Sequence, residues 1–195
     1  MLIYPKSLAG VTLIELMIAI TILGILLIAG LPEAFKWMQN AKIRTAAESI
    51  SNGLQLARGE AVRRNTSVRF QLVDSLTNSC ALSATGSNWV VSLADPNGAC
   101  DVAPSDTVAP QIVQKNSSAE GSTNVAINSG VANVVFNGLG RSTLLGANTI
   151  QVTNPTGGAC IAAGPMRCLN IVVQIGGQIR MCDPSITAVG DTRRC

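Results

Sequence analysis

The sequence predicts an α+β fold, in which one long, kinked N-terminal helix packs on an antiparallel β-sheet head. Three observations support this prediction: an unbroken apolar run near the N-terminus, an amphipathic stretch after it, and a series of short alternating segments in the rest of the chain. The first two patterns are typical of helices, and the third is typical of half-buried strands. A length of 195 residues suits a long helix and a single head.

The apolar run extends from Val11 to Leu31, and its only charged residue is Glu15. A run of this length can span a bilayer as a helix. A carboxylate inside such a run costs roughly 2.5–3.5 kcal/mol on insertion scales. We therefore expect Glu15 to have a functional reason for being there.

The helix is expected to continue beyond the apolar run. Pro32 removes one backbone donor and clashes with the preceding turn, so we expect a kink there. Six apolar residues then recur at spacings of three and four: Ile43, Ala47, Ile50, Leu54, Ala57 and Ala61. This spacing predicts a helical stripe that packs on a sheet. A helix from Val11 to about Arg64 would be about 80 Å long at about 1.5 Å per residue.

The head begins near Thr66. Alternating or apolar residues predict strands in six segments: 68–72, 88–93, 133–137, 149–153, 168–174 and 178–182. Gly176-Gly177 predicts a hairpin turn between the last two, and Gly138-Leu139-Gly140 predicts another turn. Residues 94–128 are rich in Pro, Ser, Asn, Asp and Gly, which predicts a long surface excursion with up to two short strands.

Six cysteines lie beyond the apolar run, and an even number in an exported domain indicates disulfides. Fifteen pairings are possible in principle. We favour sequence neighbours: Cys80–Cys100, Cys160–Cys168 and Cys182–Cys195. A metal site is the alternative, but the chain has no histidine and no CxxC pair. No metal or other cofactor is therefore expected.

The residue types argue against catalysis. Without histidine, the chain lacks the usual general base and any Ser-His or Cys-His arrangement. It also lacks the glycine-rich motifs that hold phosphates. The net charge of +3 says little about partners, although basic residues gather between 41 and 70 and again in the tail. No catalytic residue is predicted, which leaves assembly and binding as the functions to consider.

The segment Gly10-Val11-Thr12-Leu13-Ile14-Glu15-Leu16, with Pro32 after the apolar run, resembles type IV pilins and pseudopilins. An ordinary secretory signal fits less well, because the small residue precedes the apolar core. The resemblance implies that a prepilin peptidase cuts between Gly10 and Val11 and methylates Val11, where most members have Phe. It also implies that Glu15 meets the terminal amine of a neighbouring subunit, a cationic partner for a buried carboxylate. A plain membrane anchor with a stray glutamate is the alternative.

The C-terminal part resembles the GspH/FimT branch of minor pilins. The matching segments are CLNIVVQIGGQIRMCDP (168–184), DTRRC (191–195) and FNGLGR (136–141). In the FimT group a Gly-Arg-x-Arg segment near this hairpin is linked to DNA binding. Gly177 and Arg180 match that segment, but Gln178 replaces its first arginine. Arg193 and Arg194 would restore positive charge if the tail folds back; otherwise these arginines form a solvated strand face.

The resemblance implies three parts of the chain. Residues 1–10 are a leader, residues 11–65 form the helix (11–31 transmembrane or filament core, 32–65 amphipathic), and residues 66–195 form a periplasmic head. The expected location is the inner membrane, crossed once, and later the pilus at the cell surface. Expected partners are other pilin subunits, the prepilin peptidase, the inner membrane and, as a candidate, double-stranded DNA.

The function implied is that of a minor type IV pilin of the FimT/FimU kind. Such a protein would prime or cap the pilus tip with other minor pilins and could contribute to DNA uptake. A GspH-type pseudopilin of a type II secretion system is the alternative, because its sequence would look nearly the same. An abundant major pilin is less favoured, since the head resembles the minor branch.

Overall fold

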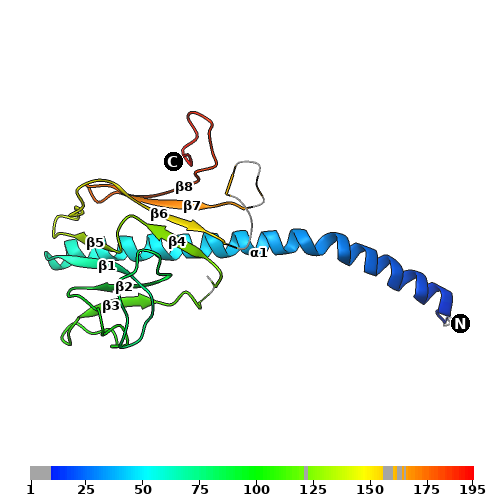
Figure 1. Cartoon of the computed structure of the whole chain (residues 1–195), viewed down its shortest axis with the longest axis horizontal. Coiled ribbons are helices and arrows are strands. Elements are labelled where there is room, and N and C mark those ends of the chain that lie inside the picture. Colours follow the sequence, from blue (N-terminus) through cyan, green and yellow to red (C-terminus); the bar gives the residue numbers. More distant parts are fainter. Residues whose placement is uncertain (1–9, 121–122, 156–159, 162–163, 165) are drawn as a thin grey trace, which may run out of the picture. The chain divides into compact units, whose positions relative to one another are not determined.

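The computed structural model describes residues 10–195 except 121–122, 156–159, 162–163 and 165. One helix, α1 (Leu13–Arg64), is followed by eight strands, β1–β8 (Figure 1). The chain separates into two compact units between Trp37 and Met38, so that the second half of α1 belongs to the same unit as the strands. This arrangement confirms the predicted α+β class with its long N-terminal helix.

The predicted apolar stripe of the helix is buried, which confirms that it packs on the head. All six of its residues are at most 1% exposed: Ile43, Ala47, Ile50, Leu54, Ala57 and Ala61. The charged residues Arg44, Glu48 and Arg58 fall on other faces of α1 and are exposed. One side of the helix therefore supplies the core contacts, and the other side faces solvent.

The helix ends at Arg64 because the next residue turns the backbone into the left-handed region. Asn65 has a φ of 48°, and its N–H donates to the carbonyl of Val62 at 3.3 Å. The N–H of Thr66 donates to the carbonyl of Ala61 at 3.2 Å. This pair of bonds is a Schellman motif, which satisfies the last helical carbonyls and releases the chain toward β1.

The first sheet contains four antiparallel strands in the order β3-β2-β1-β5. Their bounds are Val68–Val73 for β1, Asn88–Ser92 for β2, Ile112–Asn116 for β3 and Asn133–Phe136 for β5. Phe70 on the central strand lies opposite Val91 of β2 and Val134 of β5. All three side chains belong to the buried cluster that contains the helical stripe.

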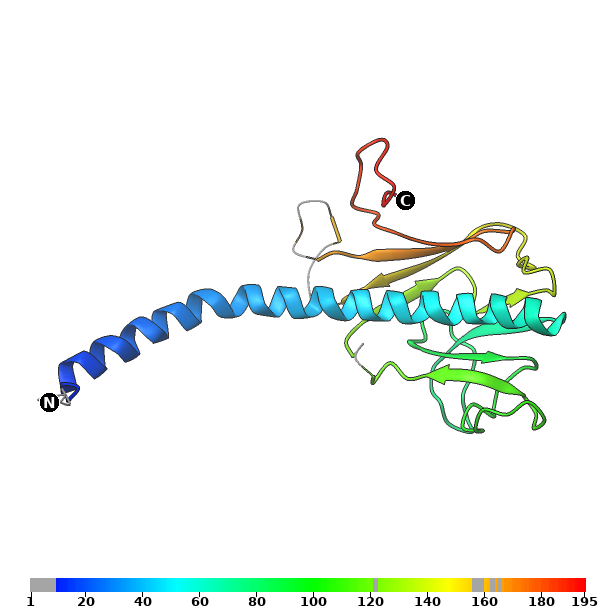
Figure 2. The same ribbon diagram turned by 180° about the vertical axis from the view of Figure 1, so that it is seen from behind.

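The second sheet also contains four antiparallel strands, in the order β4-β6-β7-β8. Their bounds are Ala126–Ser129 for β4, Asn148–Thr153 for β6, Leu169–Val173 for β7 and Ile179–Cys182 for β8. Ile150 and Ile171 face each other across β6 and β7 and join the same cluster. In Figures 1 and 2 the first sheet lies below and the second sheet above the line of α1, and Figure 2 shows the helix uncovered in front of both, so the two sheets cover the same face of its second half.

The division of the strands into two sheets is absent from the sequence prediction. The predicted segments themselves are confirmed within a residue or two. Residues 94–128 contain the short strand β3 and all but the last residue of β4. However, β5 pairs with β1, although β2, β3 and β4 lie between them in the chain. The preceding strand, β4, pairs instead with β6 of the second sheet. Pairing between distant segments leaves no local pattern to detect.

A smaller second cluster lies on the other face of the first sheet. Val73 and Val90 pack there with Ile112 and the Cys80–Cys100 disulfide. Lys115 on β3 donates three hydrogen bonds, of 2.8, 2.9 and 3.1 Å, to the consecutive carbonyls of residues 100–102. These contacts hold the long 94–111 excursion against the sheet.

Both predicted glycine turns are present, and they touch each other. Gly177, in the turn between β7 and β8, has a φ of 81°, and a Cβ there would lie 1.9 Å from the carbonyl oxygen of Gly140. That carbonyl also accepts a hydrogen bond from Nε of Arg58 at 3.2 Å. The N–H of Ser142 donates to the carbonyl of Ile175 at 3.1 Å. The segment after β5 therefore joins the end of α1 to both sheets.

Candidate functional site

The predicted cleavage site lies immediately before the helix. Gly10 and Val11 are exposed and precede α1, and apart from the chain neighbours of Gly10 no atom of the described residues lies within 4 Å of the position where its Cβ would be. Residues 1–9 of the predicted leader lie outside the described residues. No described part of the chain from Gly10 onward therefore covers the Gly10–Val11 bond.

Glu15 takes part in a capping box at the start of α1. Its N–H donates to Oγ1 of Thr12 at 3.3 Å, and the N–H of Thr12 donates to its Oε2 at 3.4 Å. This reciprocal pair satisfies two backbone donors that would otherwise have no helical partner. The signal was present in the sequence as Thr-x-x-Glu, although the sequence analysis did not use it. The capping box provides a local reason for Glu15 within a single chain.

The apolar segment after this cap has no protein around it among the described residues. Every leucine, isoleucine and methionine from Leu13 to Leu31 is at least 50% exposed. The segment is long and apolar enough to cross a membrane. Pro32 lies inside the continuous helix and has no N–H to donate to the carbonyl of Ile28. The kink at Pro32 stays a prediction.

Three disulfides join all six cysteines. The pairs are Cys80–Cys100, Cys160–Cys168 and Cys182–Cys195. The third pair links the end of β8 to the tail, where Asp183 forms a parallel bridge with Arg194. The tail therefore runs back beside β8, the strand that carries Arg180.

Arg180 contacts the returning tail through its guanidinium group. Nη1 donates to the carbonyl of Arg194 at 3.1 Å, and Nη2 donates to the carbonyl of Cys195 at 3.5 Å. Arg180 and Arg194 are exposed, and Gln178 is exposed in the turn before β8. The structure therefore brings Arg180 close to the backbone of Arg194 and Cys195.

Arg193 differs from the other two because a carboxylate neutralises it. Its Nη2 lies 2.8 Å from Oδ2 of Asp191, and its Nε donates to Oδ1 of the same group at 3.1 Å. These hydrogen bonds lower the pKa of Asp191 to about 2. Arg167 is 3.8 Å from Asp183 nearby. The predicted basic patch thus also contains Asp183 and Asp191, which offset part of its positive charge.

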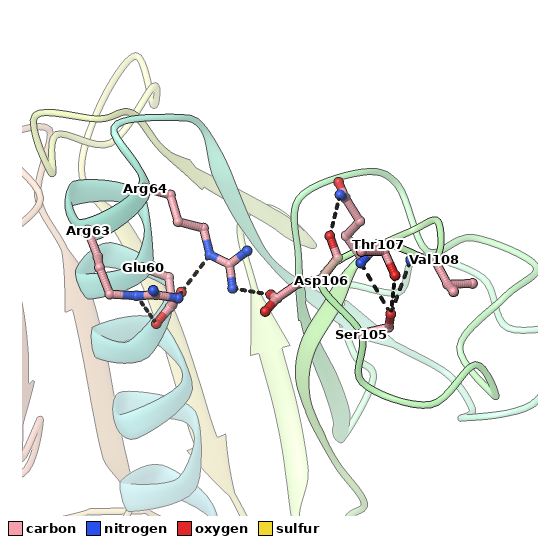
Figure 3. A network of polar contacts seen from close by, with 8 residues as sticks. Glu60, Arg63, Arg64, Ser105, Asp106, Thr107 and Val108 are labelled. Atoms are coloured by element: carbon pink, nitrogen blue, oxygen red, sulfur yellow. Dashed lines mark hydrogen bonds and ion pairs between the residues drawn. The ribbon is translucent and has the colours of Figure 1, made fainter.

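A second charged cluster lies at the C-terminal end of α1 (Figure 3). Oε2 of Glu60 lies 2.6 Å from Nη2 of Arg63 and 2.7 Å from Nε of Arg64. Arg64 also reaches Asp106 at 2.6 Å and so links the helix to the 94–111 excursion. The hydrogen bonds from Arg63 and Arg64 hold the pKa of Glu60 below its usual value, against the opposing effect of partial burial. The i,i+3 and i,i+4 spacing was a sequence signal for the first two pairs.

No arrangement in the described residues indicates catalysis. Within these ranges, no three His, Cys, Asp or Glu side chains come together as a metal ion would need. A mainly apolar depression lies between Gly130-Val131 and Thr143–Asn148, and none of its lining residues ionises. The features that remain for function are the exposed helix, its cap and the arginines near the tail.

Two family models match the chain. A model described as the prokaryotic N-terminal methylation motif matches residues 6–31. A model described as type II transport protein GspH matches residues 46–177, which is more than half of the chain. Together they cover both the apolar segment and most of the head, and they confirm the branch that the sequence indicated.

Solved structures with a similar fold include two minor subunits. One is the type IV minor pilin FimU of Pseudomonas aeruginosa, with 14% identity and a TM-score of 0.48, covering 71% of this chain and 90% of FimU. Another is the minor pseudopilin EpsH from the type II secretion system of Vibrio cholerae, with 11% identity and a TM-score of 0.45, covering 75% and 99%. A comparison with curated proteins finds no significant match. On the family models, the chain belongs to the GspH family of pilin-like proteins that carry an N-terminal methylation motif.

Proposed function

We propose that this protein is a minor type IV pilin that primes or caps the pilus at its tip together with other minor pilins. The observation that carries the proposal is the bare apolar segment from Leu13 to Leu31, in which every large aliphatic side chain is at least half exposed. A helix that is apolar on all sides needs lipid or other helices around it. Lipid provides this before assembly, and neighbouring pilin helices provide it in the filament.

The proposal divides the chain by role. Residues 1–10 form the leader, residues 11–65 the anchor and assembly helix, and residues 66–195 the head. The helix crosses the inner membrane once, with the head in the periplasm, where the disulfides form. Members of this family are structural subunits, and we propose no catalytic activity and no cofactor for this chain.

Processing by the prepilin peptidase gives the first test. Gly10→Val should leave an unprocessed precursor in the membrane, because a larger residue replaces the small one at the scissile bond. Mass spectrometry of the unmodified protein should find a mature chain that starts at methylated Val11. Gly30→Val is the matched control, because Gly30 also has nothing within 4 Å of its missing Cβ but lies far from the bond. A mature chain that starts after residue 29 would contradict the pilin assignment.

Glu15 gives the second test, because two roles have to be separated. Thr12→Ala removes one half of the capping box, worth about 1 kcal/mol, and keeps the carboxylate. Glu15→Ala removes the cap and the proposed partner of the neighbouring amine together. Both variants should insert in the membrane, but only Glu15→Ala should be largely absent from sheared pili. If Thr12→Ala is lost from sheared pili as completely as Glu15→Ala, the role of Glu15 is restricted to helix capping.

A GspH-type pseudopilin is the second candidate function, and the family model's own description favours it. A strain without this protein separates the two. Loss of surface pili with normal release of secreted enzymes supports the pilus role. The opposite result assigns the chain to type II secretion, with its helix and head serving the same kind of assembly.

DNA binding is a further candidate, favoured by the contact of Arg180 with the tail at Arg194. Because Asp191 neutralises Arg193, we expect about two effective phosphate contacts and a log–log salt slope near −1.8, at about −0.9 per contact. Arg180→Gln should reduce the slope by about one unit, and Gln178→Arg should strengthen binding. The titration uses the full chain in detergent with duplex DNA. Arg44→Gln is the control, because Arg44 is paired with Glu48 on the helix.

No binding at roughly 50 mM salt, where phosphate contacts are strongest, would exclude this candidate. Binding that Arg180→Gln and Arg44→Gln weaken equally would indicate general attraction to a basic protein. Either result leaves the assembly role untouched, because that role depends on residues 10–31 and not on the tail.

A further inference from the structure

The two tryptophans of this chain have opposite environments. Trp89 is 3% exposed, packs against Phe70 with ring centroids 5.7 Å apart, and donates from Nε1 to Ser49 at 3.0 Å. Trp37 is 74% exposed, and Phe35 nearby is 56% exposed. Aromatic residues make up only 3% of the sequence. Two of them exposed within three positions of one helix therefore need an explanation other than the core of the head.

The distance from the apolar segment places both rings at a defined depth. Val11 to Leu31 spans roughly 31 Å of helix at 1.5 Å per residue, which matches a hydrocarbon core of about 30 Å. Phe35 and Trp37 follow Leu31 by four and six residues, or roughly 6 and 9 Å. The headgroup layers add roughly 5–8 Å on each side of the core. Phe35 thus falls within the headgroup layer, and Trp37 at its outer edge or, with helix tilt, within it.

The charges in the same turn agree with this depth. Glu33 and Lys36 form an ion pair of 2.7 Å and are the first charged residues after Glu15. Neither could lie in hydrocarbon at small cost, but a paired carboxylate and ammonium suit the polar layer. The long lysine side chain can also extend toward phosphates while its methylene groups stay against apolar atoms.

We infer that Phe35, Lys36 and Trp37 form an interface belt that docks in the lipid headgroup layer on the side of the head. The indole ring is suited to this layer, because its face is apolar and its N–H can donate to lipid or water oxygens. The belt would set the depth of the anchor and keep residue 38, where the second compact unit begins, outside the hydrocarbon. This inference rests on the proposed membrane-anchored precursor.

The test uses the full chain in phosphatidylethanolamine–phosphatidylglycerol vesicles that contain lipids brominated either near the headgroup or near the chain end. Tryptophan emission is recorded for the natural sequence and for Trp37→Phe, in which only Trp89 emits. Subtracting the second spectrum from the first gives the difference signal, which reports Trp37. Bromine near the headgroup should quench the difference signal strongly, and bromine near the chain end should quench it little. Trp37→Phe should show no quenching, because Trp89 is buried in the head.

Two variants calibrate the depth. Trp37→Ala with Ala41→Trp moves the indole about one turn toward water and should abolish quenching; Ala41 is exposed. Ile22→Trp with Trp37→Phe moves it to the middle of the apolar run and should reverse the preference between the two lipids. If the chain floats with the vesicles while neither lipid quenches Trp37 or both quench it equally, the result would contradict the interface belt but would still agree with a membrane-anchored helix. If the chain does not float with the vesicles, the proposed membrane-anchored precursor is itself wrong.

Discussion

The two halves of α1 have the same secondary structure and opposite surroundings. From Leu13 to Leu31 the large aliphatic side chains are all at least 50% exposed. From Ile43 to Ala61 the striped residues are at most 1% exposed. One continuous helix thus contains a part that has no protein partner in the described chain and a part that forms the centre of the core.

The difference shows that burial depends on the pattern of apolar residues and not on their number. The first half is richer in large apolar residues, but they surround the helix, so no single face can select a sheet. The second half has fewer and smaller ones, arranged on one stripe that both sheets can cover. Helix propensity contributes little to either role, since tertiary or lipid packing provides most helical stability.

The largest expected effect comes from truncating one leucine in each half. Leu54→Ala should lower the free energy of unfolding of the head by about 2–5 kcal/mol, because it opens a cavity among fully buried side chains. Leu23→Ala should leave it unchanged, because Leu23 is 56% exposed. Urea unfolding of the full chain in detergent, followed by the emission of Trp89, measures both. A comparable loss in Leu23→Ala would mean that the first half supports the head.

A smaller effect is expected from adding one methyl group to a glycine in each half. A Cβ on Gly53 would lie 2.8 Å from Cε2 of Phe70 and 3.1 Å from two ring carbons of Trp89. Gly53→Ala should therefore destabilise the head by about 1–3 kcal/mol through overpacking, offset in part by about 1 kcal/mol of improved helix propensity. A Cβ on Gly24 would have nothing within 4 Å, so Gly24→Ala should improve the helix propensity of α1 without causing a clash.

The same unfolding measurement checks this pair, and the change in Trp89 emission in the folded state provides a second readout. A shift in that emission for Gly53→Ala alone would locate the clash at the aromatic pair. Equal stability of the two variants would show that Phe70 and Trp89 can move aside at no cost, and would weaken the view that the core contacts of α1 are closely fitted.

The sequence predicted those parts of the fold that have a local signal. The stripe from Ile43 to Ala61, the alternation around Phe70 and the Gly176-Gly177 turn each reveal an element within a few residues. The division into two sheets lacks such a signal, because it depends on β5 pairing with β1 and β4 pairing with β6. Hydrophobic alternation indicates that a strand has a buried face, but it does not indicate which strand lies beside it.

The candidate site was predictable to a similar extent. The motif around Gly10 and Glu15 indicated the family, but the capping box with Thr12 requires only a local pattern and was overlooked. For the tail, the sequence located the basic residues but not their partners. Asp191 pairs with Arg193 locally, in a turn where the N–H of Arg193 donates to Oδ1 of Asp191 at 2.9 Å. The approach of Arg180 to Arg194 depends instead on the course of the chain between β8 and Cys195, which no spacing rule describes.

The smallest effect concerns the charged side of the second half of α1, where one glutamate is nearly enclosed and another is open. Glu60 has a side chain 14% exposed and two arginine partners, whereas Glu48 is 49% exposed and pairs only with Arg44. Because the pKa of Glu60 is lowered in the folded protein, its ionised form is favoured by folding. That contribution is complete above the unfolded value of about 4.3 and is lost as the pH falls through the lower folded value.

Glu60→Gln should therefore unfold at a lower urea concentration than the natural protein at neutral pH, and the gap should close as the pH falls below about 4. Glu48→Gln should show a much smaller gap at every pH, because solvent screens an exposed pair. Titrations of both variants across this range, in the same detergent, measure the comparison. Because Arg64 also reaches Asp106, Glu60→Gln should loosen the 94–111 excursion first, which faster amide exchange there would detect. A gap that persists unchanged at low pH would mean that Glu60 stabilises the head through packing rather than through its charge.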